Sequence, residues 1–390
     1  MPKSVVDIRK RNSLLDLCAE ARSMRDQSKG RIVSFSPKVF IPLTRLCRDF
    51  CSYCVFRQTP QQAESLYMSP EEVLEVARAG QEAGCREALF VLGERPEQRY
   101  PEARKWLEDH GFTSTIHYLR AMCELVLDET RLFPHSNPGT MTERELQTLR
   151  PVNVSMGLML ESTSERLYQP GGPHEHAPSK HPRARLRTLE LAGELQIPFT
   201  TGLLVGIGET AQDRIDALEA IQDLQQRFGH IQEVIIQNFC AKPDTPMEKS
   251  AEASRDEMLE TVALARIFLG PEMNVQVPPN LTSPYWIYLE AGINDWGGIS
   301  PVTMDYVNPE ACWPQIVKMQ QQMKDRGYQL RARYSVYPEY FMERSDFIEP
   351  ELVKRLRQEA DPEGFFDGHD WSGSPLSGAT TSDSHGEIRL

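Results

Sequence analysis

Short apolar runs alternate with amphipathic stretches along most of the chain, beginning near Val33. Runs typical of strands are Val39–Pro42, Ala88–Leu92, Leu132–His135, Val152–Leu160, Phe199–Val205, Glu233–Asn238, Asn274–Val277 and Asp295–Ile299. Helical patterns lie between them at Pro70–Ala83, Glu102–Asp109, Glu143–Arg150, Ala184–Leu195, Ala211–Arg227, Asp256–Phe268 and Pro309–Arg326. This alternation is typical of parallel strands joined by crossover helices. It predicts an α/β fold, a parallel (β/α)8 TIM-like barrel that is complete or nearly complete, with Gly297 and Gly298 weakening the eighth strand.

The same pattern divides the chain into four segments. Residues 1–32 are polar, and the helical spacing of Leu14, Leu15 and Cys18 predicts an N-terminal helical extension. The barrel is expected over residues 33–345, followed by a C-terminal extension over 346–372. Residues 373–390 are rich in Ser, Gly and Thr and are expected to be disordered.

The composition indicates which partners the protein can bind and in which compartment it is expected. The 390 residues carry a formal charge of −13, which disfavours binding to nucleic acid and to anionic membranes. The chain has no apolar run of the ~18 residues expected of a transmembrane helix, and Met1 is followed by charged residues rather than a secretory signal. A cytoplasmic protein is expected. Its eight cysteines are then better explained as ligands and core residues than as disulfides.

Three of these cysteines form a C-x3-C-x2-C array directly after the first predicted strand, at Cys47, Cys51 and Cys54. One loop with this spacing can place three thiolates on three irons of a 4Fe–4S cluster, which usually has four cysteine ligands. The fourth iron is then open to a ligand that is not protein. A zinc site is the alternative, but it would need a fourth Cys or His, and this loop supplies none.

The array, with the aromatic Tyr53 before its last cysteine, resembles the signature of the radical S-adenosylmethionine (SAM) superfamily. The resemblance implies one 4Fe–4S cluster whose open iron is chelated by the amino and carboxylate groups of SAM. A low-potential donor supplies an electron, SAM is cleaved, and a 5′-deoxyadenosyl radical takes a hydrogen atom from the substrate. The cofactors carry the difficult chemistry, and the protein positions them.

The resemblance also assigns residues to SAM at the strand ends. Leu92-Gly93-Glu94 is similar to the family's Gly-Gly-Glu motif, with Leu92 in place of the first glycine. A basic residue meets the SAM carboxylate in the family, which implies Arg185 or, second, Lys180. The full set of implied SAM contacts is Tyr53, Gly93, Glu94, Ser155, Glu161, Lys180, Arg185, Gly206 and Gln237. For several of them a bare turn or a solvated helix face is the alternative reading.

Over residues 35–345 the chain resembles a narrower family, the CofG-type subunit of 7,8-didemethyl-8-hydroxy-5-deazariboflavin (FO) synthase. The segments that carry this resemblance are Phe40–Cys51, Pro134–Gly139, Ser155–Ser162, Pro198–Thr210, Ile236–Phe239 and Gly292–Pro301. It implies a carbon–nitrogen lyase that closes the deazaflavin ring of a hydroxybenzyl-ribitylaminouracil adduct, 5-amino-5-(4-hydroxybenzyl)-6-(D-ribitylimino)-5,6-dihydrouracil, with loss of ammonia. A CofH-type radical SAM partner enzyme makes that adduct. This chain has one three-cysteine array, so the partner activity is expected on another polypeptide.

Candidates for substrate contact or proton transfer are His135 and Asn137 at the third strand and Asp295 at the eighth. Each could equally be a satisfied structural residue. Two rival functions stay open. One is a CofH-type or menaquinone-pathway radical SAM enzyme that joins or rearranges an aromatic precursor, and the other is an iron–sulfur electron carrier without enzymatic activity.

Overall fold

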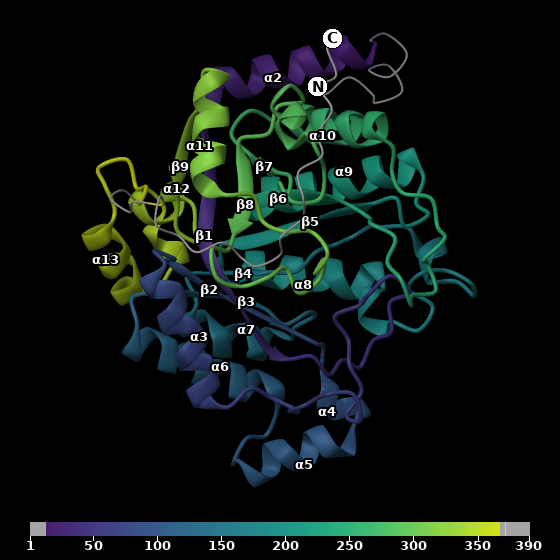
Figure 1. Ribbon diagram of the computed structural model, residues 1–390, viewed down its shortest axis with the longest axis vertical. Coiled ribbons are helices and arrows are strands. Elements are labelled where there is room, and N and C mark those ends of the chain that lie inside the picture. Colours follow the sequence, from purple (N-terminus) through teal and green to yellow (C-terminus); the bar gives the residue numbers. More distant parts are fainter. Residues whose placement is uncertain (1–12, 367–370, 372–390) are drawn as a thin grey trace.

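The computed structural model describes residues 13–366 and Trp371. Its centre is a closed barrel of eight parallel strands (Figure 1). The strands are β1 (Ile32–Thr44), β2 (Glu87–Leu92), β3 (Phe133–Asn137), β4 (Ser155–Gly157), β5 (Phe199–Val205), β6 (Ile231–Asn238), β7 (Asn274–Gln276) and β8 (Asp295–Ile299). Closure is complete because β1 pairs in parallel with both β2 and β8. The predicted barrel is therefore confirmed, including its glycine-containing eighth strand.

A ninth strand, β9 (Gln329–Ala332), was not predicted. It pairs in parallel with Ile32–Phe35, while β2 pairs with β1 from Lys38 onward. The sequence of β9 alternates polar and apolar residues over only four positions, so it gives no apolar run to detect. The extra strand extends the sheet at the end where β1 begins.

Helices surround the barrel and begin at clear sequence signals. They are α3 (Pro70–Glu82), α4 (Pro96–Arg99), α5 (Pro101–Asp109), α6 (Thr115–Glu129), α7 (Glu143–Leu149), α8 (Pro182–Glu194), α9 (Ala211–Phe228), α10 (Arg255–Leu269), α11 (Ile316–Asp325), α12 (Pro338–Met342) and α13 (Pro350–Glu359). Capping boxes start α3, α9 and α10 at Ser69, Thr210 and Ser254. Among the described residues, none of the helices has both the length and the apolar character needed to cross a bilayer.

Several helices differ from the sequence-based expectation, and α4, α12 and α13 are among those that were not predicted. Helix α6 lies between β2 and β3 and was not predicted, and its buried positions include Thr115, Tyr118 and Cys123 among the apolar ones. Helix α11 begins at Ile316 rather than at Pro309. The residues before it form a loop in which the Trp313 ring stacks on Phe40 and its indole N–H donates to the Thr303 carbonyl at 3.1 Å. Pro314 follows directly, and a proline disfavours helical backbone in the residue before it.

The helix expected in the N-terminal extension is α2 (Leu14–Lys29), which begins at a Ser13 capping box and packs against α10 (Figure 1). Its Arg25 is fully buried and donates to the Tyr328 hydroxyl at 2.7 Å and to the Ile293 carbonyl. The tail predicted to be disordered, residues 373–390, lies outside the described residues. The domain boundaries stay predictions.

The interior of the barrel near the start of its strands is polar. The Arg333 guanidinium, just after β9, contacts the Asp295 carboxylate at 2.7 and 3.0 Å and the Glu233 carboxylate at 2.9 Å. The Tyr337 hydroxyl donates to the same Glu233 oxygen at 2.9 Å. All of these side chains are buried. A buried charge is tolerated only when it is paired and hydrogen-bonded, and this cluster meets that requirement.

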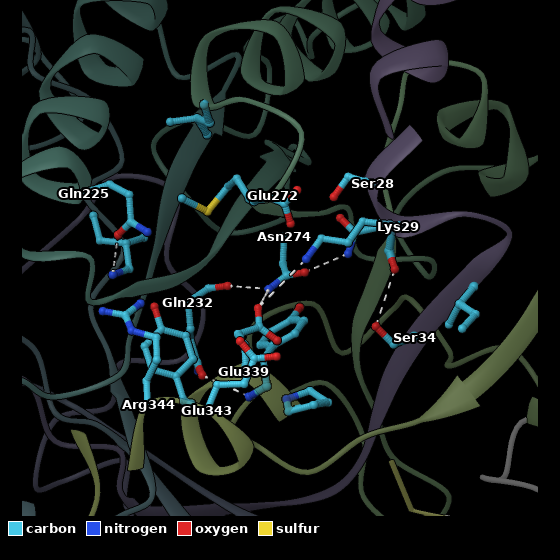
Figure 2. A pocket seen from close by; sticks show the side chains of 18 of the residues that line it. Ser28, Lys29, Ser34, Gln225, Gln232, Glu272, Asn274, Glu339, Glu343 and Arg344 are labelled. Atoms are coloured by element: carbon cyan, nitrogen blue, oxygen red, sulfur yellow. Dashed lines mark hydrogen bonds and ion pairs between the residues drawn. The ribbon is translucent and has the colours of Figure 1, made fainter. Parts of the chain in front are cut away.

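A hollow of about 550 Å³ opens beside this cluster, at the end of the barrel where β1, β6 and β7 begin. Figure 2 shows Lys29, Asn274 and Glu339 lying close together in it. Asn274 Nδ2 donates to the Gln232 carbonyl at 2.8 Å and to Glu339 Oε1 at 2.9 Å. None of the residues that the sequence assigns to the cluster or to SAM lines this hollow.

Replacing Arg333 by methionine should strongly destabilise the protein, because Asp295 and Glu233 would lose the guanidinium that lies between them. The free energy of unfolding should fall by about 3–5 kcal/mol, measured by urea denaturation followed by circular dichroism. Arg227→Met is the matched control, because the ion pairs of Arg227 are exposed at the surface. Equal denaturation midpoints for the two variants would contradict this account of the barrel interior.

Candidate active site

A second cavity, of about 360 Å³, lies at the end of the barrel where the strands finish. Active sites of such barrels form at this end, from the loops that follow the strands. The three cysteines of the array all line it. So do seven of the nine residues that the resemblance assigns to SAM: Tyr53, Gly93, Glu94, Glu161, Lys180, Arg185 and Gln237. The structure thus brings together residues that are far apart in the sequence.

The cysteine array lies on the loop after β1, and neighbouring segments hold this loop by its backbone. The Arg48 N–H donates to the Glu94 carbonyl at 2.8 Å, which ties the loop to the end of β2. The Phe50 and Ser52 N–H groups donate to the carbonyls of His176 and Pro173, both at 2.9 Å. Because these bonds involve the backbone, the loop conformation does not depend on the side chains that face the cavity.

The three thiols line the same cavity; Cys51 is buried, and Cys47 and Cys54 are half-buried. Burial raises the pKa of Cys47 to about 12, and the neighbouring Asp49 adds to the shift. Burial also raises the pKa of Cys51, and the charges of Cys54 and Cys47 raise it further. A bound metal reverses this tendency, because a coordinating thiol is deprotonated. Three thiols that line one cavity therefore suit a metal cluster, which would stabilise their thiolate form.

Gly93 allows the loop to approach the end of β2. A Cβ atom at Gly93 would lie 1.9 Å from the Leu46 carbonyl oxygen and 2.8 Å from Cys47 Cβ, so no larger residue fits without movement. The next N–H, that of Glu94, donates to Cys47 Sγ at 3.2 Å. An N–H donor to a cysteine sulfur is one of the ways in which a protein tunes an iron–sulfur cluster.

Two cations line the cavity on this side, Lys180 from the segment between β4 and α8 and Arg185 from the first turn of α8. The Lys180 ammonium binds the Glu161 carboxylate and lies 5.9 Å from the centre of the Tyr53 ring. Arg185 is buried and donates to the carbonyls of Ser179, at 3.1 Å, and Met159. Glu161 has a left-handed backbone with φ of 65°, which turns the chain after β4. This wall of the cavity therefore carries two positive charges and one negative charge.

His174 is a site residue that sequence reasoning missed. It lies in the loop after β4, where histidines more often face solvent, yet it is buried, with its Nε2 2.9 Å from the Tyr53 hydroxyl. Burial lowers the pKa of His174 to about 2, and Lys180 and Arg185 add to the shift, so the ring is neutral. Its hydrogen bond orients Tyr53 within the cysteine loop. A motif search gives no signal for such a contact, because the two residues are far apart in the sequence.

Four of the predicted site residues lie outside the cavity wall. The Ser155 hydroxyl bonds His135 Nδ1 at 2.7 Å and donates to the Ser335 carbonyl at 3.0 Å. Gly206 forms a turn in which its N–H donates to Glu209 at 2.9 Å. Asp295 is bound by Arg333 in the polar cluster at the other end of the barrel. Asn137 does line the cavity, beyond His135 on β3.

The wall formed by β6, β7, β8 and β1 is polar and was not anticipated. Besides Gln237 it presents Lys38, Asn238, Gln276 and Lys242. The Lys242 ammonium donates to Asn308 Oδ1 at 2.7 Å. Another cysteine, Cys240, lines the same wall, with Asn238 Nδ2 3.4 Å from its Sγ. Polar residues inside strands follow the ordinary alternation of a strand, so the sequence alone does not mark them as functional.

Comparison with known proteins agrees with this geometry. A family profile described as the radical SAM superfamily matches residues 41–221. Among solved structures, the [FeFe]-hydrogenase maturase HydG of Carboxydothermus hydrogenoformans superposes with a TM-score of 0.67 at 21% identity, covering 89% of this chain and 82% of HydG. Methylornithine synthase has a TM-score of 0.65 at 19% identity, with 83% and 92% of the two chains covered. These likenesses show the fold. The barrel and its three-cysteine loop define a radical SAM protein.

Sequence relatives place the chain in one family within the radical SAM class. The 7,8-didemethyl-8-hydroxy-5-deazariboflavin synthase of Methanopyrus kandleri is 52% identical over 335 residues, covering 86% of this chain and 99% of that protein. The FO synthase of Streptomyces avermitilis is 47% identical over 374 residues, and the match covers 91% of this chain but only 43% of that longer protein. The chain belongs to the 7,8-didemethyl-8-hydroxy-5-deazariboflavin synthase family. The cofactors of the radical SAM superfamily are a 4Fe–4S cluster and SAM, and three thiols in one cavity fit them.

Replacing Gly93 by alanine should lower cluster content, because the added methyl group forces Leu46 and Cys47 away from the end of β2. Iron and sulfide per chain are measured after anaerobic reconstitution, and we expect less than half of the wild-type content. Gly111→Ala is the control, since Gly111 has open space around it and lies away from the cavity; its φ of 80°, unlike the backbone of Gly93, disfavours a Cβ atom, so this variant reports backbone strain without a clash at the cluster loop. Full iron content in Gly93→Ala would show that this close approach is not needed.

Proposed function

We propose that the chain is the CofG-type enzyme of deazaflavin biosynthesis. Its reaction would close the deazaflavin ring of the 5-amino-5-(4-hydroxybenzyl)-6-(D-ribitylimino)-5,6-dihydrouracil adduct with loss of ammonia, as a carbon–nitrogen lyase. The observation that carries the proposal is that one cavity joins the three-cysteine loop to a polar wall made by β6, β7, β8 and β1. A cofactor and a polar substrate can therefore meet in one site.

In this proposal Cys47, Cys51 and Cys54 hold the cluster, and the cations at Lys180 and Arg185 face the SAM carboxylate. When bound, the cluster and SAM supply a 5′-deoxyadenosyl radical that removes a hydrogen atom from the substrate. Tyr53, oriented by His174, packs beside the bound SAM. The backbone of Gly93 and Glu94 and the side chains of Glu161 and Gln237 complete that side of the cavity. The protein's contribution is to hold the two molecules in contact and to exclude water.

The substrate side of the cavity is formed by residues beyond the cysteine loop. Asn137 reaches the cavity from the end of β3, and we place it against the substrate. His135 lies within β3 and is held by Ser155. Burial lowers the pKa of His135 to about 4, so the ring is neutral near pH 7. Because His135 lies outside the cavity wall, a proton from the substrate could reach it only by way of a neighbouring residue. Asp295 contributes indirectly, by fixing Arg333 beneath the site.

The assignment to the CofG type rests on two features of the chain. It has one three-cysteine array, and the residue before the last cysteine is Tyr53. The pattern of the rival CofH-type and menaquinone-pathway enzymes has a phenylalanine at this position. The chain also matches nearly the full length of the Methanopyrus kandleri relative. The adduct would then come from a CofH-type partner enzyme, and a low-potential electron donor would reduce the cluster.

Cys51→Ala should abolish cluster binding without unfolding the barrel. Cys51 is a loop residue after β1, and the loop is held by backbone hydrogen bonds that the substitution leaves in place. We expect near-zero SAM cleavage and strongly reduced iron content, with an unchanged circular dichroism spectrum. Cys85→Ala serves as the control, because Cys85 is buried away from the cavity. Wild-type iron content in Cys51→Ala would refute the assignment of the cluster ligands.

The proposed reaction is tested directly by incubating the reconstituted protein anaerobically with SAM, a reductant and the adduct. We expect 5′-deoxyadenosine together with a fluorescent deazaflavin whose mass is that of FO. Formation of 5′-deoxyadenosine without deazaflavin would leave the radical SAM class intact and exclude this substrate. The CofH-type reaction, from tyrosine and 5-amino-6-ribitylaminouracil, would then be assayed next. Intact SAM in every reaction would support the electron-carrier alternative.

A further inference from the structure

Strand β8 contains two consecutive glycines, and each leaves space for a polar side chain from another strand. A Cβ atom at Gly297 would lie 1.8 Å from Nε2 of Gln276, which ends β7. A Cβ atom at Gly298 would lie 1.6 Å from Cε of Lys38 on β1. Both side chains line the cavity. Larger residues on β8 would push both side chains aside, so the glycines allow them to reach this position.

Gln276 lacks a protein partner for its side-chain amide. The residue is 5% exposed and lines the cavity, and no protein partner for its amide is found within the described part of the chain. An amide offers both a donor and an acceptor. An amide on a cavity wall with both groups left over by the protein can pair with a ligand that carries a complementary donor and acceptor.

Lys38 is held in place but keeps free donors. Its ammonium lies 3.1 Å from Glu87 Oε1, and the other oxygen of that carboxylate accepts a hydrogen bond from the Ser36 hydroxyl. An ammonium has three N–H donors, so the ion pair with Glu87 leaves others for a ligand. Burial acts to raise the pKa of Glu87, but Lys38 and other neighbours outweigh it and lower that pKa, so the anchor stays charged.

An aromatic surface adjoins the two polar groups. The rings of Phe40 and Trp313 stack with their centres 5.5 Å apart and an angle of 17° between their planes, and both line the cavity. Phe40 is two residues beyond Lys38 on β1, so both side chains lie on the inner face of the strand. The ligand that fits here is flat, with hydrogen-bonding groups along one edge.

We propose that Gln276 and Lys38 recognise a cyclic imide, the O=C–NH–C=O edge of a pyrimidinedione ring. The Gln276 amide would accept from the imide N–H and donate to one ring carbonyl, and the Lys38 ammonium would donate to the other ring carbonyl. This inference rests on the proposed function, because that substrate carries such an edge. It adds the residues that select the substrate and gives Gly297 and Gly298 the role of making room for them.

The test compares two probes on the anaerobic holoenzyme with SAM and no reductant. One probe is 5-amino-6-ribitylaminouracil, and the other is the same molecule with a methyl group on the imide nitrogen. Isothermal titration calorimetry gives the Kd of each. The wild type should bind the parent probe at least about tenfold more tightly, since methylation removes the donor and leaves the Gln276 oxygen unpaired. Gln276→Leu should bring the ratio of the two Kd values close to one.

Three further variants separate recognition from folding. Lys38→Met should raise the Kd of both probes and keep the ratio of the two Kd values. The methyl group on the imide nitrogen of the second probe does not touch the carbonyl that Lys38 binds. Gly298→Ala should behave like Lys38→Met, since its methyl group displaces that side chain. Gln321→Leu, at an exposed glutamine of α11, is the matched control and should keep the wild-type ratio. If Gln276→Leu fails to incorporate iron, Gln276→Met replaces it, because this variant keeps the length of the side chain and removes both the amide oxygen and the N–H donor.

The outcomes distinguish this inference from the proposed function. Wild-type discrimination between the probes in a Gln276 variant with full iron content would overturn the inference. Equal affinity of the wild type for both probes would also overturn it. Deazaflavin formation by the wild type in either case would leave the proposed function standing. A wild-type protein that cleaves SAM but neither binds the parent probe nor forms deazaflavin would overturn both.

Discussion

The pairing of β1 with both β2 and β8 is the constraint on which the rest of the structure depends. It closes the sheet, and because every strand of the barrel is parallel, it brings the ends of all eight to one rim. The cysteine loop follows β1, the residues that face it follow β2 and β4, and the opposite wall comes from β6, β7 and β8. An open sheet would place the first and last of these strands at opposite edges, and no common cavity would form.

The two ends of the barrel use polar residues differently. At the end where the strands begin, the buried charges of Arg333, Asp295 and Glu233 satisfy one another. At the other end, Gln276 has no partner within the described residues, and Lys38 has donors to spare. Mutual satisfaction is typical of a structural core, whereas partial satisfaction inside a cavity indicates a place for a ligand. This difference, more than the sizes of the two hollows, identifies the chemical end of the barrel.

Sequence reasoning predicted most of the barrel. An apolar run indicates a buried strand or the buried face of a helix, and a capping box indicates where a helix begins. It missed β9, which is only four residues long, and it missed α6, although Ile116, Leu119 and Val126 recur there at helical spacing. For the candidate site, a motif on one loop was enough to propose the three cysteines as cluster ligands, and the structure places all three on the wall of one cavity. His174, Gln276 and Lys38 could not be found in this way, because their roles come from partners on other strands or loops.

The sequence by itself therefore determined the class of protein. Three thiolates on one loop can hold three irons of a 4Fe–4S cluster, and their short spacing is visible in the chain. Only the tertiary structure decided which polar residues face the cavity. It shows Asp295 bound by a buried arginine, and Gln276 and Lys38 occupying the space that two glycines leave on β8. The physical reason is that a ligand contact depends on which strands are neighbours and on how closely their backbones approach. Both are properties of the closed barrel, and no single segment of the chain contains them.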